Sequence, residues 1–509
     1  MKPKMETDLK AKLEAFMELV RKISAYNEAI SLMHWDLRTG APRKSVELRS
    51  GVIGTLSAEQ FKLRVSDEMG EYIAFFTRPE VDSQLDETTR RVVKECKKDY
   101  DENRRIPAKK IEEFSVLSAH TQTIWEEAKA NDDFASFEPN LAKIVDLLKE
   151  FIGYWGVKGT TYDTLLDKYE PDLTVAKLDE VFGRLRDRLV PLVAAIQASP
   201  NKPDTTFLDQ IFEREQQEKM GLFILEQMGY DFDAGRHDES VHPFAIGLNS
   251  GDVRITTHYL QDDVTSALFS SLHEGGHALY EQNISKDLAG TPLATGTSMG
   301  IHESQSRLWE NIIGRSRPFW ERYYPDLQKH FPQQLQDVSL DDFYRAVNRV
   351  ENSLIRIESD ELTYNLHIII RYEIEKMIFN EGLEVKDLPK VWNEKYREYL
   401  GITPPNDSLG VLQDVHWSGG DFGYFASYSL GNMYAAQIMN TMKKELPELD
   451  RYIREGNLIP IKEWLTEKIY RFGKSLTPAE IIMHVTGEEL NPDYLADYLE
   501  EKYKEIYKL

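Results

Sequence analysis

The segment Leu272-His273-Glu274-Gly275-Gly276-His277-Ala278-Leu279 contains two histidines four residues apart, with a glutamate directly after the first. On a helix, residues four apart lie on one face, so both imidazoles reach the same ion. Zinc accepts imidazole nitrogens at about 2.0–2.1 Å. Glu274 lies beside a ligand without being one, which suits it to act on a metal-bound water. The segment therefore predicts the metal helix of a zinc-dependent peptidase.

The residues around this motif both favour and oppose a helix. An apolar ridge with four-residue spacing leads into the motif: Val264, Leu268 and Leu272. Gly275 and Gly276 oppose it, because each glycine costs about 1 kcal/mol in a helix interior. We therefore expect another group to approach the helix closely at the glycines, either the segment 253–257 or a bound substrate.

Helical periodicity covers most of the remaining chain. Apolar residues recur at three- and four-residue spacing over roughly 9–23, 110–130, 140–155, 176–198, 208–228, 262–283, 303–316, 340–380 and 429–446. Residues 253–257 differ, because they are rich in β-branched side chains and follow a turn signal at 249–252. We predict a mainly α-helical protein, with a small β-sheet beside the metal helix, in which residues 1–509 form a single unit.

The composition argues against several other classes of protein. The formal net charge of -24 disfavours nucleic acid, whose phosphates need clusters of lysine and arginine. No run of about 18 apolar residues exists, so we expect no membrane span. The first residues lack the apolar core of a secretory signal, and Cys96 is the one cysteine. These features together predict a cytoplasmic protein.

A third metal ligand is expected in the acidic cluster at 301–307. A catalytic zinc needs three protein ligands and one open position. Glu303 is the best candidate, because it follows a loop rich in glycine and threonine and opens the next apolar helix. The alternative for Glu303 is an acid favoured by the helix dipole. His302 is an alternative ligand or a substrate contact.

Five motifs follow one another in order along the chain. They are His242-Pro243-Phe244, Asp252-Val253-Arg254-Ile255-Thr256, His273 to His277, His302-Glu303-Ser304-Gln305 and Ile355-Arg356-Ile357-Glu358-Ser359-Asp360. They resemble the HPF, DxRxT, HExxH, HES/GQ and I/V-R-x-x-A-D motifs of the carboxypeptidase Taq family of metallocarboxypeptidases. Ser359 departs from the usual alanine, while the arginine and aspartate of that motif remain. Similar segments at 33–36, 414–417 and 423–434 extend the resemblance over nearly the whole chain.

The resemblance implies a largely helical unit with two lobes around a deep substrate groove. It implies zinc, for which cobalt substitutes, bound by His273, His277 and Glu303. It also implies that Glu274 is the general base and later the proton shuttle. A homodimer that removes C-terminal residues from peptides with broad specificity is expected on the same ground.

Catalysis also needs a donor for the tetrahedral oxyanion. Related helical zincins supply a tyrosine and a histidine from a late segment, which corresponds here to residues 416–428. We expect Tyr428 to stabilise the oxyanion, with His416 as a helper. Tyr424 is a candidate substrate contact, and the alternative for both tyrosines is a place in the groove wall or the core.

An exopeptidase must recognise a free carboxylate, which suits the bidentate fork of arginine. Arg356 in the family-like motif is the first candidate, and Arg349, seven residues earlier, is the second. The alternative for either is an ion pair with a neighbouring acid. His242 either binds substrate or closes a turn. Asp360 is a candidate for orienting a ligand histidine.

Two other functions remain open on the sequence. A zinc endo- or oligopeptidase of the same architecture would use the same metal site without a carboxylate anchor. A catalytically silent binding protein would keep a structural zinc site, but such sites usually close all four positions, often with cysteine. Cys96 lies far from the motif, and a structural site would not need Glu274. We therefore predict a zinc-dependent metallocarboxypeptidase acting on peptides.

Overall fold

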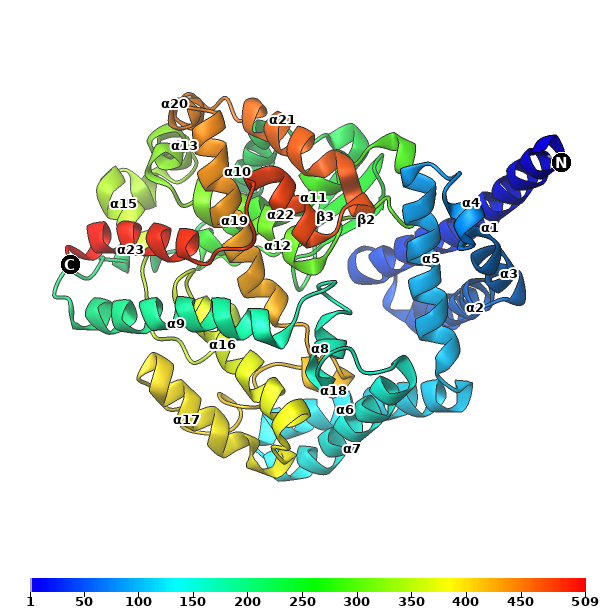
Figure 1. The fold of residues 1–509 in the computed structure, drawn as a ribbon. Helices are drawn as coiled ribbons and strands as arrows, with labels where there is room; N and C mark the ends of the chain where they lie inside the picture. Colours follow the sequence, from blue (N-terminus) through cyan, green and yellow to red (C-terminus); the bar gives the residue numbers. More distant parts are fainter. Residues whose placement is uncertain (1) are drawn as a thin grey trace.

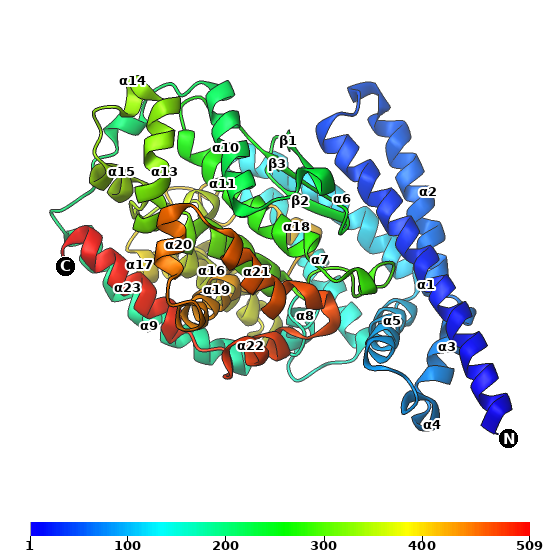
Figure 2. The ribbon, with the colours of Figure 1, turned by 90° about the horizontal axis from the view of Figure 1, so that it is seen from above.

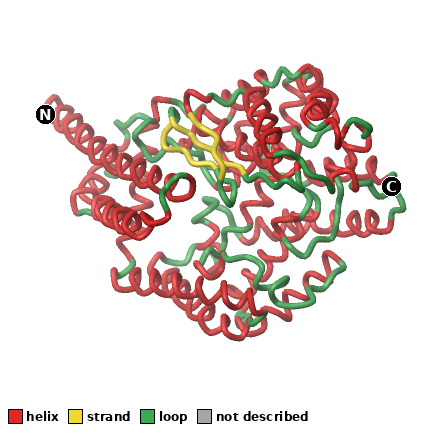
Figure 3. The backbone as a smooth tube through the Cα atoms, turned by 180° about the vertical axis from the view of Figure 1, so that it is seen from behind, coloured by secondary structure: helices red, strands yellow, loops and turns green. Residues whose placement is uncertain are grey.

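The computed structural model describes the backbone of residues 2–509 and the side chains of residues 9–509. Helices make up most of the molecule, and one small sheet lies among them (Figure 1, Figure 3). The predicted fold class is therefore confirmed. Within the described residues, no helix is both long enough and apolar enough to cross a membrane.

The N-terminal helices form an arm on one side of the molecule (Figure 1, Figure 2). They are α1 (Lys2–Thr39), α2 (Val46–Arg64), α3 (Asp67–Phe76), α4 (Pro79–Asp82) and α5 (Glu87–Arg105). The arm contacts the small sheet through α1. There the Trp35 ring packs on Phe244, with the ring centroids 5.4 Å apart.

A second group of helices lies below α19 in the view of Figure 1. It consists of α6 (Ala108–Asn131), α7 (Phe134–Trp155), α8 (Thr161–Leu166), α9 (Val175–Ala198), α16 (Thr363–Lys376), α17 (Leu388–Leu400) and α18 (His416–Gly419). α16 packs on α9, α17 and α19, and nearly all of its side chains are buried. A helix that is buried all round marks the interior of a large protein.

The last group of helices contains the central pair α11 (Val264–Gln282) and α12 (Met299–Arg307). Its other members are α10 (Arg214–Met228), α13 (Arg317–His330), α14 (Pro332–Leu335), α15 (Leu340–Val347), α19 (Ala426–Glu445), α20 (Leu449–Glu455), α21 (Ile459–Lys468), α22 (Pro478–Thr486) and α23 (Asp493–Tyr507). Two π-helical turns are η5 (Leu308–Ile313) and η7 (Met377–Glu381). Short 3-10 turns are η1 (Arg43–Ser45), η2 (Thr206–Leu208), η3 (Phe232–Ala234), η4 (Lys286–Leu288), η6 (Arg356–Glu358), η8 (Val385–Asp387) and η9 (Tyr470–Ser475).

The predicted strand is the centre of a three-stranded sheet. β3 (Asp252–Thr257) lies between β1 (Gly235–Glu239), which is parallel to it, and β2 (Ala245–Asn249), which is antiparallel. β3 and β2 pack against α11, and Val253 and Ile255 of β3 are fully buried. The sheet therefore lies beside α11, the helix that carries the histidine motif, as predicted (Figure 2).

One predicted helix is wrong. The pattern over 340–380 is interrupted, because α15 ends at Val347 and α16 begins only at Thr363. Between them the backbone of Arg356 donates to Gln413 Oε1 at 2.9 Å. Asp360 Oδ1 accepts from the backbone N–H of Thr363, also at 2.9 Å, and so caps α16. These pairings satisfy the backbone outside a helix, which periodicity alone does not reveal.

Candidate metal centre

The crossing of α11 and α12 brings the sequence motifs together. Asp263 caps the start of α11 by accepting from the backbone N–H of Thr265 at 2.9 Å. A Cβ at Gly276 would lie 2.6 Å from the carbonyl oxygen of Gln305, so only glycine allows α12 so close. Side chains of α10 approach Gly275 in the same way. The predicted close approach is thus present, but α12 and α10 make it, in place of the segment 253–257 or a substrate.

His273, His277 and Glu303 form a group whose ligand atoms all lie within 4.8 Å of one another. Glu303 Oε2 lies 3.6 Å from His273 Nε2 and 3.5 Å from His277 Nε2. In a tetrahedral site with ligands at about 2.0–2.1 Å, ligand atoms are separated by about 3.3–3.4 Å. The three side chains therefore fit a single small cation with little movement.

The other ring nitrogen of each histidine has a partner of its own. His273 Nδ1 lies 2.8 Å from Glu310 Oε2. His277 Nδ1 lies 2.6 Å from His302 Nδ1, and His302 Nε2 lies 2.8 Å from Glu281 Oε1. Such partners leave Nε2 of each imidazole for the metal and hold the ring in place.

These contacts bear on two expectations. His302 lies against a histidine of the group and is not one of its three members, and its role as a substrate contact stays a prediction. Asp360, which was a candidate to orient a ligand histidine, accepts hydrogen bonds from Glu351, Leu362 and Thr363. That expectation was wrong, because Glu310 and His302 take the role.

Arg307 holds one oxygen of the Glu303 carboxylate by a hydrogen bond. Its Nε donates to Glu303 Oε1 at 2.6 Å, which leaves Oε2 facing the histidines. Its Nη1 also lies 3.4 Å from Glu310 Oε2. Burial raises the pKa of Glu303, but Arg307 and the histidines outweigh it and hold that pKa well below its usual range. Glu303 is therefore an ionised, one-oxygen ligand candidate.

The two histidines differ in charge preference. Burial lowers the pKa of His273, but Glu303 and Glu310 outweigh it and raise the pKa to about 9. Burial lowers the pKa of His277 to about 4; Glu303 opposes this fall, while the neighbouring imidazoles of His302 and His273 add to it. A divalent cation would take the place of the proton that His273 holds beside its carboxylates.

Glu274 is buried beside the group without joining it. Within the described residues, its carboxylate makes no hydrogen bond, so both oxygens are open to a water. Burial raises the pKa of Glu274 to about 7; His273 opposes that rise and Glu303 adds to it. A carboxylate poised near neutrality both takes and returns a proton, as a general base must.

Aromatic side chains from 416–428 gather at one end of the site. The hydroxyls of Tyr428 and Tyr424 lie 3.1 Å apart, and the His416 ring stacks on Tyr424 with centroids 5.5 Å apart. The Tyr364 ring meets Tyr428 edge-on and also lies under Arg307, whose Cζ is 4.5 Å from the ring centroid. Tyr364 therefore connects this aromatic end to the Glu303 support.

Arg356 is buried and joins the same aromatic end. Its Nε and Nη2 donate to Asp414 at 3.2 and 2.9 Å, and its Nη1 donates to the Tyr364 hydroxyl at 3.0 Å. Its Cζ lies 5.2 Å from the Tyr428 ring centroid. Arg371 shares Asp414, with Nη2 2.5 Å from Oδ2. Two guanidiniums and one carboxylate leave this cluster with a net positive charge.

Arg349 and His242 lie elsewhere. Arg349 is exposed, where it pairs with Glu351 at 3.2 Å and donates to Thr205 Oγ1 at 3.0 Å. His242 is exposed on the loop between β1 and β2, where its carbonyl accepts from Ser240 Oγ at 2.7 Å. Among the described residues, no hydrogen bond or ion pair joins either side chain to the metal group, and their substrate roles stay predictions.

Sequence reasoning missed five residues that shape the site. They are Glu281, Arg307, Glu310, Tyr364 and Asp414. Arg307 and Glu310 stand four and seven residues after Glu303, and this helical spacing was an available signal. Asp414 belongs to a noted motif, but nothing in the sequence pairs it with Arg356. No local pattern distinguishes Tyr364 from a core tyrosine.

Known proteins resemble this chain over nearly its full length. The family model described as carboxypeptidase Taq (M32) metallopeptidase matches residues 15–503. Carboxypeptidase 1 of Bacillus subtilis is 51% identical over 494 residues, which cover 97% of this chain and 98% of that protein. Thermostable carboxypeptidase 1 of Thermus thermophilus is 39% identical, with 98% and 99% covered. The crystal structure of the M32 carboxypeptidase from Deinococcus radiodurans R1 superposes with a TM-score of 0.95 at 37% identity, covering 98% of this chain and 100% of that one.

Proposed function

The chain belongs to the carboxypeptidase Taq (M32) family and is a metallocarboxypeptidase, and we propose that zinc held by His273, His277 and Glu303 is its metal. The observation that carries this proposal is the placement of Glu303 Oε2 at 3.5 and 3.6 Å from the two Nε2 atoms. Two imidazoles, one carboxylate oxygen and one open position are the donor set of catalytic zinc sites. Cobalt would fit the same donors.

Zinc, when bound, supplies a Lewis acid that polarises the scissile carbonyl and acidifies water. Glu274 takes a proton from the attacking water and passes it to the leaving nitrogen. Its burial and its unpaired oxygens support this role. Arg307 keeps Oε1 of Glu303 occupied, so that one oxygen is offered to the metal.

Tyr428 is proposed to donate to the oxyanion of the tetrahedral intermediate, with His416 as a helper. Among the described residues, the Tyr428 hydroxyl has one hydrogen-bond partner, the hydroxyl of Tyr424. His416 Nδ1 is buried and has no partner in the described part of the chain. Buried polar atoms without partners are costly unless something else satisfies them. A bound peptide would supply that partner.

The Arg356 cluster is proposed to attract the free carboxylate of the substrate. Arg356 and Arg371 share the single carboxylate of Asp414, so the cluster carries one unmatched positive charge in a buried place. A substrate carboxylate would neutralise it, and an amidated peptide would not. This difference separates an exopeptidase from an endo- or oligopeptidase with the same metal group.

The test uses one peptide with a free C-terminus and its amidated twin, each incubated with the zinc-loaded protein and followed by mass spectrometry. Loss of single residues from the free peptide alone is the expected result. Internal cleavage of both peptides would favour the endopeptidase. No cleavage of either peptide by metal-loaded protein would contradict the proposed mechanism and favour a silent binding protein.

Three further features belong to the same proposal. Family resemblance supports a homodimer and a single unit whose two lobes enclose a deep groove that admits peptides of broad sequence. The single cysteine, Cys96, supports a cytoplasmic location. Light scattering on the eluted protein should give twice the chain mass of 59.0 kDa. A mass of one chain at micromolar concentration would refute the dimer.

A further inference from the structure

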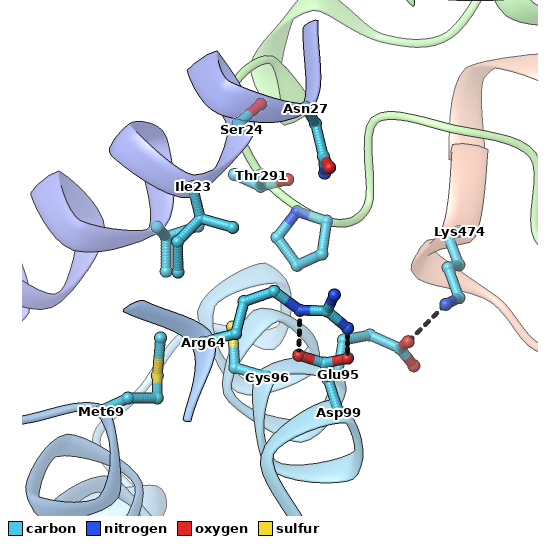
Figure 4. Close-up of a pocket in the computed structure, with 12 residues that line it drawn as sticks. Ile23, Ser24, Asn27, Arg64, Met69, Glu95, Cys96, Asp99, Thr291 and Lys474 are labelled. Carbon is cyan, nitrogen blue, oxygen red and sulfur yellow. Dashed lines mark hydrogen bonds and ion pairs between the residues drawn. The ribbon is translucent and has the colours of Figure 1, made fainter. Parts of the chain in front are cut away.

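A cavity of about 280 Å³ lies where the N-terminal arm meets the rest of the molecule (Figure 4). Helices α1, α2, α3 and α5 form its arm side. Thr291, Pro292 and Lys474 close it from the other side. The metal ligands do not line it. It is therefore a separate space, enclosed by segments that are far apart in the sequence.

One end of the cavity presents hydrogen-bond donors. Arg64 Nε donates to Asp99 Oδ2 at 2.7 Å and Nη2 donates to Asp99 Oδ1, but Nη1 has no partner among the described residues. Figure 4 shows this guanidinium rising toward Asn27, which reaches down from α1. The Oδ1 of Asn27 accepts from Gln60, so its Nδ2 is left as a donor. Two donors, one of them charged, suit a carboxylate.

The same cavity also presents a carboxylate. Glu95 Oε2 pairs with Lys474 Nζ at 2.6 Å, while Oε1 has no hydrogen-bond partner in the described part of the chain. The charged groups in the lining are two cations, Arg64 and Lys474, and two anions, Glu95 and Asp99. Their charges cancel in sum but are separated in space. Such a lining matches a zwitterion better than a simple anion or cation.

Much of the remaining wall is apolar, although Ser24, Cys96 and Thr291 also line it. Its apolar residues are Val20, Ile23, Met69 and Pro292. Figure 4 shows Ile23 and Met69 on the side of the cavity away from Lys474. Small-molecule sites combine an apolar wall with a few converging polar groups and have volumes from about 300 Å³ upward. At about 280 Å³ the cavity is at the small end of that range. It has room for one amino acid and none for a peptide chain.

We propose that this cavity binds a free amino acid with an apolar side chain. Its carboxylate lies against Arg64 Nη1 and Asn27 Nδ2, its ammonium against Glu95, and its side chain against Val20, Ile23 and Met69. Free amino acids are the product class of a carboxypeptidase, so the cavity is a second, product-binding site. That link rests on the proposed function, whereas the binding itself does not.

The cavity also lies next to the residues that contact the metal group. A neighbouring hollow of about 340 Å³ shares Glu95, Asp99 and Lys474 with it and is lined by His302. His302 is the partner of His277. An amino acid bound at Glu95 would therefore be separated from His302, the partner of His277, only by the hollow that Glu95 and His302 both line.

Methyl NMR of the zinc-loaded protein, with the methionine methyl groups labelled, tests the proposal without any catalysis. Met69 lines the cavity, and its resonance is assigned by comparison with Met69→Leu. L-leucine should shift it saturably. N-acetyl-L-leucine and L-leucinamide, which lack the ammonium or the carboxylate, should not. An unchanged Met69 signal at tens of millimolar L-leucine would overturn the proposal even if peptides are cleaved as expected.

Two variants of lining residues and one control variant test where the amino acid binds. Asn27→Ala and Glu95→Gln should each weaken L-leucine binding about tenfold, because each removes a hydrogen bond to a charged group of the ligand. Asp101→Asn on the same helix α5 as Glu95 does not touch the cavity and should leave the affinity unchanged. Equal affinities in all three variants would place the ligand elsewhere and overturn the proposal. Carboxypeptidase activity is measured separately, so its failure is distinguishable from a failure to bind.

Discussion

The metal end and the aromatic end of the site are held in different ways. At the metal end, each of the three ligand candidates has a second partner: Glu310 for His273, His302 for His277 and Arg307 for Glu303. At the aromatic end, the functional atoms have few partners. Tyr428 meets only the hydroxyl of Tyr424, and His416 Nδ1 meets nothing polar among the described residues.

This difference indicates that the protein fixes the positions of the metal-group side chains before a metal or a substrate binds. Ligand side chains fixed by outer partners bind a metal without rearranging. Hydroxyl and imidazole groups without partners are instead available to a substrate. The backbone at the aromatic end is nevertheless fixed, because Glu375 accepts from Trp417 Nε1 and from the backbone N–H of Gly423, both at 2.7 Å. At this end, the groups left available to a substrate are side-chain atoms such as the Tyr428 hydroxyl and His416 Nδ1.

Glu274→Gln should have the largest effect on turnover. The change keeps the shape of the side chain but removes the base, so kcat should fall by about 10³-fold or more. Metal content should stay the same, because Glu274 is not in the ligand group. Steady-state kinetics on a tripeptide, with metal analysis of the same sample, checks both. A kcat within tenfold of the unmodified protein would remove Glu274 from the mechanism.

Tyr428→Phe should come next and acts at the aromatic end. Loss of an oxyanion donor costs about 10²–10³-fold in kcat, while KM should change little. Tyr424→Phe is the matched control, since it removes the neighbouring hydroxyl and should cost much less. Equal losses in both variants would mean that the pair works as a unit and that Tyr428 has no special role.

Glu310→Gln should lower metal affinity about 10–100-fold through His273. Glu281→Gln reaches His277 only through His302, so its loss should be smaller. Competition with a chelator of known affinity measures both without an activity assay. Unchanged affinity in both variants would show that the outer partners do not hold the ligands, and the contrast between the two ends would fail.

The smallest effect concerns pH and the aromatic end. Burial raises the pKa of Glu375 to about 7 from its ordinary value of 4.5. A raised folded-state pKa gives stability that is complete below pH 4.5 and is lost as pH rises to about 7. The slope is at most about 1.4 kcal/mol per pH unit.

Glu375→Gln should flatten this part of the stability profile when urea midpoints are compared between pH 5 and 8. Burial also raises the pKa of Glu170 to about 7, so a residual slope is expected. An identical profile in the variant would show that Glu375 is ionised in the folded protein throughout this range.

Local features of the sequence predicted that His273, His277 and Glu303 come together, as the structure has them. The four-residue repeat indicated the two histidines, and the loop before α12 with the apolar helix after it indicated Glu303. Their role as metal ligands stays a proposal. The structural likeness to M32 carboxypeptidases bears out the fold class. The partners of the ligand candidates were not predicted: the spacing of Arg307 and Glu310 after Glu303 was an available signal that was not used, and Glu281 lies 21 residues before its partner His302.

Long-range pairings account for the remaining misses. Arg356 binds Asp414, which lies 58 residues later in the chain, and this pairing helps to keep 348–362 out of the predicted helix. Gly276 faces α12, not the sheet, because the crossing of two helices decides which neighbour comes closest. Sequence periodicity describes one helix or strand at a time. It therefore does not predict contacts between two segments that are distant in the sequence.

Locating the metal tests the contrast between the two ends most directly. Diffraction data collected on both sides of the zinc absorption edge, from crystals of the zinc-loaded protein, would give its position. We predict one anomalous peak at about 2.0–2.2 Å from His273 Nε2, His277 Nε2 and Glu303 Oε2, with the Glu310, His302 and Arg307 contacts unchanged. A peak bound by His302, or a Glu303 released from Arg307, would contradict the preformed metal end.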